Sequence, residues 1–521
     1  MIVDYRALGR TTRSRVGLLD SVSPLAATTG QDLFDDARAV AGALAERGLG
    51  PGDRAVLVVP TGLDHLVVLV GCLLAGVAPC TVAAPTNPAD PNSAGTRHVR
   101  AAIEVIRPGL VVAMSAHIDN AVTVADLRRG PTPRWDDFPE PAPEQAHHIQ
   151  LTSGSTSAPK AVVLTHANVA ANLGALRTTS GAEAGRDRVL SWLPLYHDMG
   201  LVQVLLALST DLDLDLMAPT AFLRDPTSWP RHMAARRATL TAAPPFAYRT
   251  AADRHVARPD PGLDLSALRQ AYVGAEPIPV SALRSFHDAF TGAGLADDVL
   301  VPCYGMAETV LATTVALRSS ERNDFGRVRT TPFEGRRLVS CGRPVPGTEL
   351  RLLDAGGAPV APGAVGTIHV RGDSVMAGYL TVEGPQAPVD GWHDTGDLGL
   401  LDDGDLFVVG RVKELLIVRG RNLPPYDVEE VVEQHPLVGP GSSAVFSYAT
   451  DDGVTESVVA VVETRARDEQ WPGLRTEVAT AVRQAFGLSL ADVVIRRRLP
   501  RTSSGKRQRS ALRAAYLADL G

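Results

Sequence analysis

Between about residues 30 and 310, short apolar runs alternate with longer stretches of mixed polarity. The runs are rich in valine, isoleucine and leucine and show little polar alternation, as strands buried on both faces of a sheet do. Strands are predicted at 55–59, 110–114, 148–152, 161–165, 189–193, 239–242 and 271–274. Helices are predicted between them at 32–47, 168–178, 230–237 and 279–290. This alternation indicates β-α units arranged in parallel sheets.

Beyond about residue 338 the pattern changes to short runs separated by glycine, proline and aspartate turns. The runs at 349–354, 366–371 and 405–409 indicate a small, more antiparallel, β-barrel-like subdomain. The last hundred residues combine a strand at 415–418 with helices at 428–435 and 474–486. We therefore predict an α/β fold with a large N-terminal domain (1–410) and a small α+β C-terminal domain (411–521). Two domains suit 521 residues, because a domain usually holds roughly 100–200.

The composition is typical of a soluble globular protein, with 45% hydrophobic and 21% charged residues. The net charge of −7 argues against a general nucleic-acid-binding surface. The most apolar run, 66–78, is shorter than the ~18 residues that a membrane span needs, so we expect a buried helix there. Four cysteines form no C-x-x-C pair, which disfavours a zinc site or a disulfide framework. No apolar segment typical of a signal peptide follows the N-terminus, so we expect a cytoplasmic protein.

A loop rich in small hydroxyl residues follows the strand predicted at 148–152. It reads Leu-Thr-Ser-Gly-Ser-Thr-Ser-Ala-Pro-Lys over residues 151–160. Small residues let backbone N–H groups converge on phosphate oxygens, and the hydroxyls and Lys160 add donors and positive charge. It is not a Walker A loop, because the G-x-x-x-x-G-K-[ST] spacing is absent. The alternative is a serine- and threonine-rich turn with no ligand.

Five further motifs follow in order, and together with this loop they resemble the adenylate-forming superfamily of acyl-CoA ligases, adenylation domains and luciferases. They are S-W-L-P-L-Y-H-D-M-G at 191–200, V-G-A-E-P at 273–277, Y-G-M-A-E at 304–308, T-G-D at 395–397 with G-R-V-K-E at 410–414, and P-R-T-S-S-G-K at 500–506. The resemblance spans nearly the whole chain. It implies ATP as a substrate, Mg²⁺ as a cofactor, and a mobile C-terminal domain that turns about Lys413.

The resemblance also assigns roles to single residues. Lys506 would be the main catalytic cation, Glu308 the magnesium ligand, and His197 would lie between the ATP and acyl sites. The remaining predicted nucleotide-binding residues are Thr152, Ser153, Gly154, Ser155, Thr156, Lys160, Gly274, Ala275, Glu276, Tyr304, Gly305, Met306, Ala307, Asp397 and Arg411. Tyr304 would stack on adenine, and Asp397 would accept the ribose hydroxyls with Arg411 closing over the sugar.

Each of these residues also has an ordinary structural interpretation. Lys506 would then be an exposed lysine in a basic tail, Glu308 a residue at a helix start, and Tyr304 a core tyrosine. Asp397 or Arg411 would be a turn residue or half of a surface ion pair. The His197-Asp198 pair has no third metal ligand nearby in the sequence.

Within the superfamily, the motifs look most like those of fatty acyl-AMP ligases. The aspartate of an F-D-x-S segment, which binds the amine of an amino acid, is replaced by Leu-Pro-Leu-Tyr-His at 193–197. The acid is therefore expected to be fatty or aryl. The residues predicted to line its pocket are His197, Phe246, Ala247, Gly274 and Met306. The acceptor of the acyl group would be a carrier-protein thiol, with coenzyme A or a non-thiol nucleophile as alternatives.

Two departures from the family pattern leave alternatives open. Ala161 stands where the phosphate loop usually has glycine, and an inactive adenylate-binding scaffold would need such a broken motif. The stretch 311–338 looks short for the segment that acyl-AMP ligases insert there and that disfavours coenzyme A.

Two groups of basic or titratable residues lie outside these roles. The adjacent His147 and His148 are expected to face opposite sides of a strand and to share no ligand. The basic run at 496–509 suits phosphate approach or an acidic carrier protein, or is simply a solvated surface.

Overall fold

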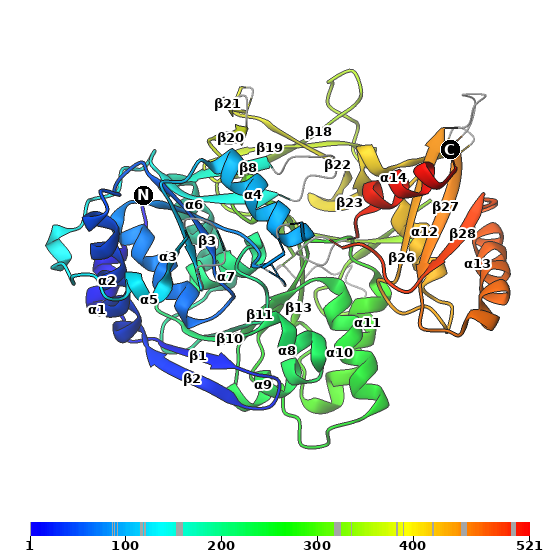
Figure 1. Ribbon diagram of the computed structural model, residues 1–521. Coiled ribbons are helices and arrows are strands. Elements are labelled where there is room, and N and C mark those ends of the chain that lie inside the picture. Colours follow the sequence, from blue (N-terminus) through cyan, green and yellow to red (C-terminus); the bar gives the residue numbers. More distant parts are fainter. Residues whose placement is uncertain are drawn as a thin grey trace.

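The computed structural model describes residues 2–85, 87, 89–90, 92–114, 118, 121–152, 160–316, 325–334, 336–381, 384–388, 390–418, 421–449, 456–501 and 507–520. Two large sheets form the body of the molecule, and a smaller lobe containing the C-terminus lies beside them (Figure 1). Within the described ranges, no helix combines the length and the apolar composition that crossing a bilayer requires.

The first large sheet has nine strands in the order β17-β14-β13-β12-β11-β9-β10-β1-β2. Its central pairs, from β13 to β1, are parallel, and antiparallel pairs flank them. The strands are β1 (Arg15–Leu19), β2 (Pro24–Thr29), β9 (Arg188–Ser191), β10 (Asp213–Met217), β11 (Leu240–Ala243), β12 (Gln270–Val273), β13 (Leu300–Gly305), β14 (Ala312–Val315) and β17 (Arg343–Pro344).

The second large sheet has eight strands in the order β21-β20-β8-β7-β4-β3-β5-β6. They are β3 (Arg54–Val58), β4 (Ala78–Thr81), β5 (Leu110–Ala113), β6 (Ala121–Thr123), β7 (Ala146–Thr152), β8 (Lys160–Thr165), β20 (Gly378–Thr381) and β21 (Gly384–Gln386). The pair β7–β8 is antiparallel, whereas the alternating pattern suggested parallel pairing throughout. The phosphate loop therefore joins two neighbouring antiparallel strands, which confirms the prediction of a strand on each side of it.

Helices separate and cover these sheets. They are α1 (Tyr5–Thr11), α2 (Gly30–Glu46), α3 (Leu63–Ala75), α4 (Ala94–Ile106), α5 (Val124–Leu127), α6 (His166–Ser180), α7 (Asp198–Ser209), α8 (Pro219–Arg224), α9 (Ser228–Arg236), α10 (Pro245–Ala257) and α11 (Val280–Phe290). Thr165 caps the N-terminus of α6. Its hydroxyl oxygen accepts a hydrogen bond from the Asn168 backbone N–H, and the Asn168 side-chain oxygen accepts one from the Thr165 backbone N–H. This cap explains why the helix starts at His166.

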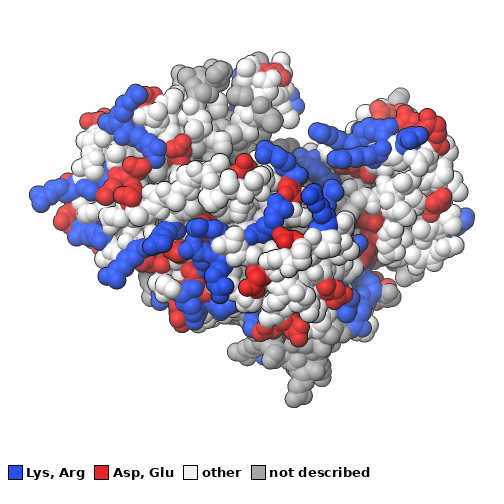
Figure 2. Space-filling view, turned by 90° about the horizontal axis from the view of Figure 1, so that it is seen from below, with Lys and Arg blue, Asp and Glu red and all other residues white. Residues whose placement is uncertain are grey.

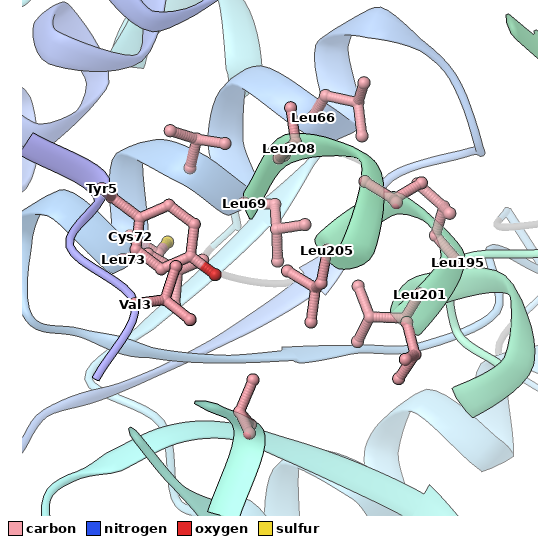
Figure 3. Packing of buried hydrophobic residues seen from close by; sticks show 14 of the residues in the cluster. Val3, Tyr5, Leu66, Leu69, Cys72, Leu73, Leu195, Leu201, Leu205 and Leu208 are labelled. Atoms are coloured by element: carbon pink, nitrogen blue, oxygen red, sulfur yellow. The ribbon is translucent and has the colours of Figure 1, made fainter. Parts of the chain in front are cut away.

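The largest core cluster lies where α3 and α7 pack between strands of both sheets. In Figure 3, Leu66 and Leu69 of α3 lie next to Leu208 and Leu205 of α7, and Leu73 lies beside Tyr5. Nearly every side chain of α3 is buried, which confirms the prediction of a buried helix in the most apolar run. A helix that is apolar on all sides belongs in such an interior position.

The β-rich region is a four-stranded antiparallel sheet in the order β18-β19-β22-β23. Its strands are β18 (Thr348–Leu353), β19 (Gly366–Gly372), β22 (His393–Asp402) and β23 (Asp405–Arg411), and the hairpin β15 (Thr330–Phe333) with β16 (Arg336–Val339) lies next to it in the chain. This confirms the predicted change from parallel to antiparallel structure beyond residue 338.

The C-terminal lobe is α+β, as predicted. It contains β24 (Leu416–Val418), β25 (Arg421–Leu423), α12 (Pro425–Val432), β26 (Ser443–Ala449), β27 (Glu456–Glu463), α13 (Trp471–Phe486), β28 (Asp492–Arg496) and α14 (Arg509–Leu520). Its apolar core is separate from the cores of the large body. Helix α12 begins three residues earlier than predicted, because Pro424 and Pro425 fit the first turn of a helix, where no N–H donor is needed.

Candidate active site

Tyr304 and Asp397 meet at one wall of a large cavity between the body and the C-terminal lobe. The Tyr304 hydroxyl, on β13, donates to Asp397 Oδ2 at 2.8 Å. Arg411 Nε donates to Asp397 Oδ1 at 2.8 Å, because the antiparallel register of β22 and β23 places residues 397 and 411 opposite each other. Burial raises the pKa of Asp397, and the Arg411 charge opposes that rise. All three residues line the cavity. The motifs that contain them therefore meet there, although Asp397 is 93 residues from Tyr304 and 14 from Arg411 in the sequence.

The two residues that flank the phosphate loop lie at the same cavity. Thr152 ends β7 and Lys160 begins β8, and the two are paired across the hairpin. Both line the cavity, as does Glu308 in the short 3-10 turn Ala307–Thr309. Ser153, Gly154, Ser155 and Thr156 lie outside the described residues.

The strand end at residues 273–277 is shaped by a close backbone approach. A Cβ on Gly274 would lie 2.9 Å from the carbonyl oxygen of Cys303, which explains glycine at this position. Ala275 follows with a φ of +68°, a conformation that side chains rarely adopt. Ala275 and Glu276 line the cavity, whereas Gly274 supports it from behind.

His197 caps the start of α7 and lines the cavity. Its Nδ1 accepts from the Met199 N–H at 3.3 Å and lies 2.5 Å from Asp198 Oδ1. Within the described residues no group of three or more His, Cys, Asp and Glu side chains has the arrangement of a metal site.

The cavity has a volume of about 2100 Å³, and one part of it, called the chamber below, has a mainly apolar lining. The chamber lies between α6, α7 and one face of the nine-stranded sheet. Its lining residues are Leu176, Ser180, Val189, Val202, Gln203, Leu206, Leu240, Ala242, Tyr272, Cys303, Ala312 and Val315. Burial raises the pKa of Cys303 to about 12, so this thiol remains protonated beside any acyl group held there.

The predicted acid-binding residues separate into two sets. Phe246, Met306 and His197 line the cavity. Ala247 does not: it has no exposed surface and packs in the core with Tyr248. Ala247 lies on a side of α10 that packs against the core, whereas Pro245, Phe246 and Arg249 of the same helix line the cavity.

The basic run at the C-terminus is largely structural. Arg509 donates to Glu429 and Glu414 at 2.8 Å each, and Arg507 forms ion pairs with Glu429 and Glu433. Burial and these carboxylates, which act in opposite directions, leave the pKa of Arg507 raised. Arg501 and Arg507 form an antiparallel bridge and line the cavity, and Lys506 lies outside the described residues.

An ion pair and a hydrogen bond connect helix α12 of the C-terminal lobe to the body. Arg336 of β16 forms an ion pair with Asp427 of α12 at 2.7 Å, and the Ser281 hydroxyl donates to Glu430 at 3.2 Å. Lys413 lies in the 3-10 turn Val412–Glu414 that joins the two parts and lines the cavity. Figure 2 shows the notch between the lobes, with lysine and arginine side chains on both of its rims.

The prediction that His147 and His148 face opposite sides of a strand is wrong. Both are buried, and their Nδ1 atoms are 2.9 Å apart. The register of β7 shifts between Ala146 and His148, so the side chains do not alternate regularly. They form a structural cluster with Tyr5 and His166.

Tyr379 was missed from the sequence. Its hydroxyl donates to Glu308 Oε1 at 2.6 Å, and Lys160 Nζ lies 4.7 Å from its ring centroid. The pair Gly378-Tyr379 begins a short strand, but nothing in the local pattern indicates that this strand pairs with β8, more than 200 residues earlier.

A polar nucleotide-sized cleft that continues into an apolar chamber suits the joining of ATP to an apolar acid, and the class so defined is that of the adenylate-forming enzymes. The chain belongs to the family of AMP-binding enzymes, whose family model matches residues 11–380. The predicted superfamily and the α/β fold are thereby confirmed.

Individual relatives agree with this assignment. A putative acyl-CoA synthetase of Caulobacter vibrioides is 33% identical over 93% of this chain and 90% of its own. The long-chain-fatty-acid–AMP ligase FadD26 of Mycobacterium tuberculosis is 32% identical, covering 90% of this chain and 88% of its own. Among solved structures, a chain from a study of fatty acyl-adenylate ligases of E. coli and L. pneumophila aligns with a TM-score of 0.87 and 30% identity over 99% of this chain and 98% of that one. An AMP-forming ligase, as predicted, is what these similarities support.

Proposed function

We propose that the enzyme activates a fatty or aryl carboxylic acid with ATP, releases pyrophosphate, and transfers the acyl group to a carrier-protein thiol. The observation that carries the proposal is the apolar chamber, which opens into the same cavity as Asp397, Lys160 and Glu308. Aliphatic and small side chains dominate its lining, so an acid with an apolar body fits best. The names of the mycobacterial relative and of the aligned structure point to the same class of acid.

In the first half-reaction, a carboxylate oxygen attacks the α-phosphorus of ATP and the bond to the β-phosphate oxygen breaks. The products are the acyl-adenylate and pyrophosphate. Asp397 would accept hydrogen bonds from the ribose, and the exposed part of Tyr304 would contact adenine. Lys160 and Lys506 would stabilise negative charge that develops on the phosphates, since preorganised cations act strongly in a water-poor site.

Mg²⁺ suits the phosphate end of this cavity. Glu308 supplies one hard carboxylate oxygen there, and Mg²⁺ commonly takes one or two carboxylates together with phosphate oxygens and water. The ion would neutralise charge on the pyrophosphate that leaves. The Tyr379 hydroxyl donates its hydrogen bond to Oε1 of Glu308, so Oε2 would be the oxygen that binds the ion.

The C-terminal lobe, from about residue 411, would act as a mobile lid on the large domain. Arg501 and Arg507 flank the loop that carries Lys506, and both line the cavity that holds Asp397. This arrangement supports delivery of Lys506 to the phosphates in the present orientation of the lobe. Rotation about Lys413 would then withdraw the lysine and admit the thiol.

In the second half-reaction, the thiol sulfur attacks the acyl carbon, the mixed-anhydride C–O bond breaks, and AMP leaves with the thiol proton passing to solvent or a base. The basic rims of the notch suit an acidic carrier protein. Coenzyme A is the second candidate, since the stretch 311–338 is short. Four free cysteines and the need for ATP are consistent with a cytoplasmic enzyme.

The test is pyrophosphate release measured with fatty, aryl and amino acids, followed by transfer to holo-carrier protein or coenzyme A. Activity with apolar acids and none with amino acids is the expected result. A folded protein that is silent with every acid would refute the proposal.

Substitution of the two lysines separates the half-reactions. Lys506→Ala should lower adenylation about 10²–10³-fold while ATP binding stays nearly unchanged. Lys413→Ala should leave adenylation intact and slow thiol transfer. Equal loss of ATP binding and adenylation in Lys506→Ala would contradict its assigned role.

A further inference from the structure

Tyr379 lies behind the phosphate end of the cavity, on β20. This strand runs antiparallel to β8 and pairs Tyr379 with Val162, two residues after Lys160. Lys160 and Glu308 both line the cavity, whereas Tyr379 is absent from its lining. Tyr379 therefore contacts the two charged groups from the protein side and leaves their other faces open.

The tyrosine uses two different parts of its side chain for the two charges. Its hydroxyl donates a hydrogen bond of 2.6 Å to Glu308 Oε1. Its ring lies beneath the ammonium of Lys160, with Nζ 4.7 Å from the centroid, within the range of a cation–π contact. One side chain thus orients both the predicted metal ligand and the predicted phosphate-binding cation.

The backbone before Tyr379 reinforces this arrangement. The Met376 N–H donates to the Glu308 carbonyl at 2.8 Å, and the Ala377 N–H donates to the Val163 carbonyl at 3.1 Å. Gly378 has a φ of +155°, and a Cβ there would lie 2.7 Å from the Gln386 carbonyl oxygen. A single segment therefore holds the backbones of both the Glu308 turn and strand β8.

Without this tyrosine, the opposite charges of Lys160 and Glu308 would be free to pair with each other. In the described part of the chain they form no direct ion pair. His393 packs edge-on against the ring of Tyr379 on a further side.

We infer that Tyr379 is a positioning residue for the adenylation reaction: it keeps Glu308 and Lys160 apart and aimed at the Mg²⁺–pyrophosphate end of ATP. The inference rests on the proposed function of that site. It predicts that loss of the hydroxyl weakens Mg²⁺ binding, and that loss of the ring also weakens binding of the ATP phosphates.

The experiment compares Tyr379→Phe, Tyr379→Leu and a matched control, Tyr5→Phe. Tyr5 also makes one buried tyrosine hydrogen bond, 2.8 Å to His147, but in the structural histidine cluster. Pyrophosphate release is measured against Mg²⁺ concentration at saturating ATP and acid. Tyr379→Phe should raise the half-saturating Mg²⁺ concentration about tenfold with kcat within about threefold, since one hydrogen bond to a charged group is lost.

Tyr379→Leu should show the same Mg²⁺ effect and, in addition, a KM for ATP raised about fivefold, because the cation–π contact is removed as well. A second readout is independent of turnover: Mn²⁺ is titrated into each variant with a non-hydrolysable ATP analogue and followed by electron paramagnetic resonance. Weaker Mn²⁺ binding in both Tyr379 variants, and unchanged binding in Tyr5→Phe, would support the inference.

Three outcomes would count against it. Unchanged Mg²⁺ and Mn²⁺ dependence in Tyr379→Phe would overturn it, and so would an equal shift in Tyr5→Phe. Equal effects of the Phe and Leu variants on the KM for ATP would overturn the part assigned to the ring. A wild-type protein that is silent with every acid would instead refute the proposed function, and the Mn²⁺ titration would still decide the role of Tyr379.

Discussion

Asp397→Asn tests the nucleotide end of the site most directly. The change keeps the size of the side chain and removes its charge. In the wild type, the carboxylate accepts from Tyr304 and Arg411 and is 6% exposed. Its remaining lone pairs would accept from the ribose.

The magnitude follows from the lost charge. A hydrogen bond to a charged group contributes about 1.5–3 kcal/mol, and a neutral amide retains part of it. We therefore expect kcat/KM for ATP to fall about 10–100-fold, with most of the change in KM. The KM for the acid should change little, because the chamber is lined by other residues.

The assay is pyrophosphate release with ATP varied at saturating acid, next to Asp405→Asn as the control. Asp405 is also a partly buried aspartate on β23, paired with Arg329 and Arg343, but it does not line the cavity. The Asp405→Asn substitution should lower thermal stability without changing the KM for ATP. If Asp397→Asn raised that KM no more than Asp405→Asn does, the assignment of Asp397 to the ribose would be refuted.

Three other predictions concern the chamber, the core and the lid. Leu206→Trp should narrow the chamber and raise the KM for long acids at least tenfold, while the KM for a short acid stays unchanged. Equal effects on long and short acids in the same pyrophosphate assay would contradict the role of the chamber. Burial lowers the pKa of four histidines especially strongly, so the unfolded state binds more protons than the folded state at low pH. The free energy of unfolding should therefore fall as the pH drops from 6.5 toward 4, by about 1.4 kcal/mol per pH unit for each of them; urea unfolding at pH 5.0 and 6.5 checks this, and a flat profile would contradict it. The four are His65, His147, His148 and His166. Burial raises the pKa of Asp427 to about 7, and the charge of Arg336 opposes this rise. The contact between Asp427 and Arg336 should therefore be favoured at low pH and weaken as the pH rises from about 4 to 7. Förster resonance energy transfer across the notch measures this dependence; Asp427→Asn should remove it, and an unchanged dependence would exclude Asp427 as its source.

Most of the fold followed from local pattern. Apolar runs without polar alternation marked the parallel strands, and the change to glycine, proline and aspartate turns marked the antiparallel region. The local pattern could not predict which strands pair with each other. The antiparallel hairpin β7–β8 and the bulge that brings His147 against His148 depend on which strands become neighbours.

The same limit explains the results at the site. Tyr304, Asp397 and Arg411 were found because each lies within a motif of its own. Tyr379 was missed because its importance comes from β20 lying beside β8. Ala247 was misassigned because membership in an apolar stretch does not say which side of helix α10 faces the chamber.

The ion cluster of the C-terminal lobe restricts how the lysine can reach the nucleotide. Arg507 is held by Glu429 and Glu433 and is bridged to Arg501, so both ends of the segment 502–506 are fixed to the lobe. Consecutive Cα atoms are about 3.8 Å apart, so the Cα of Lys506 cannot leave the neighbourhood of Arg507. Under the proposed function, Lys506 would therefore reach the nucleotide only together with the whole lobe, not by extension of its own loop. The timing of catalysis would then depend on the contacts that hold the lobe in place.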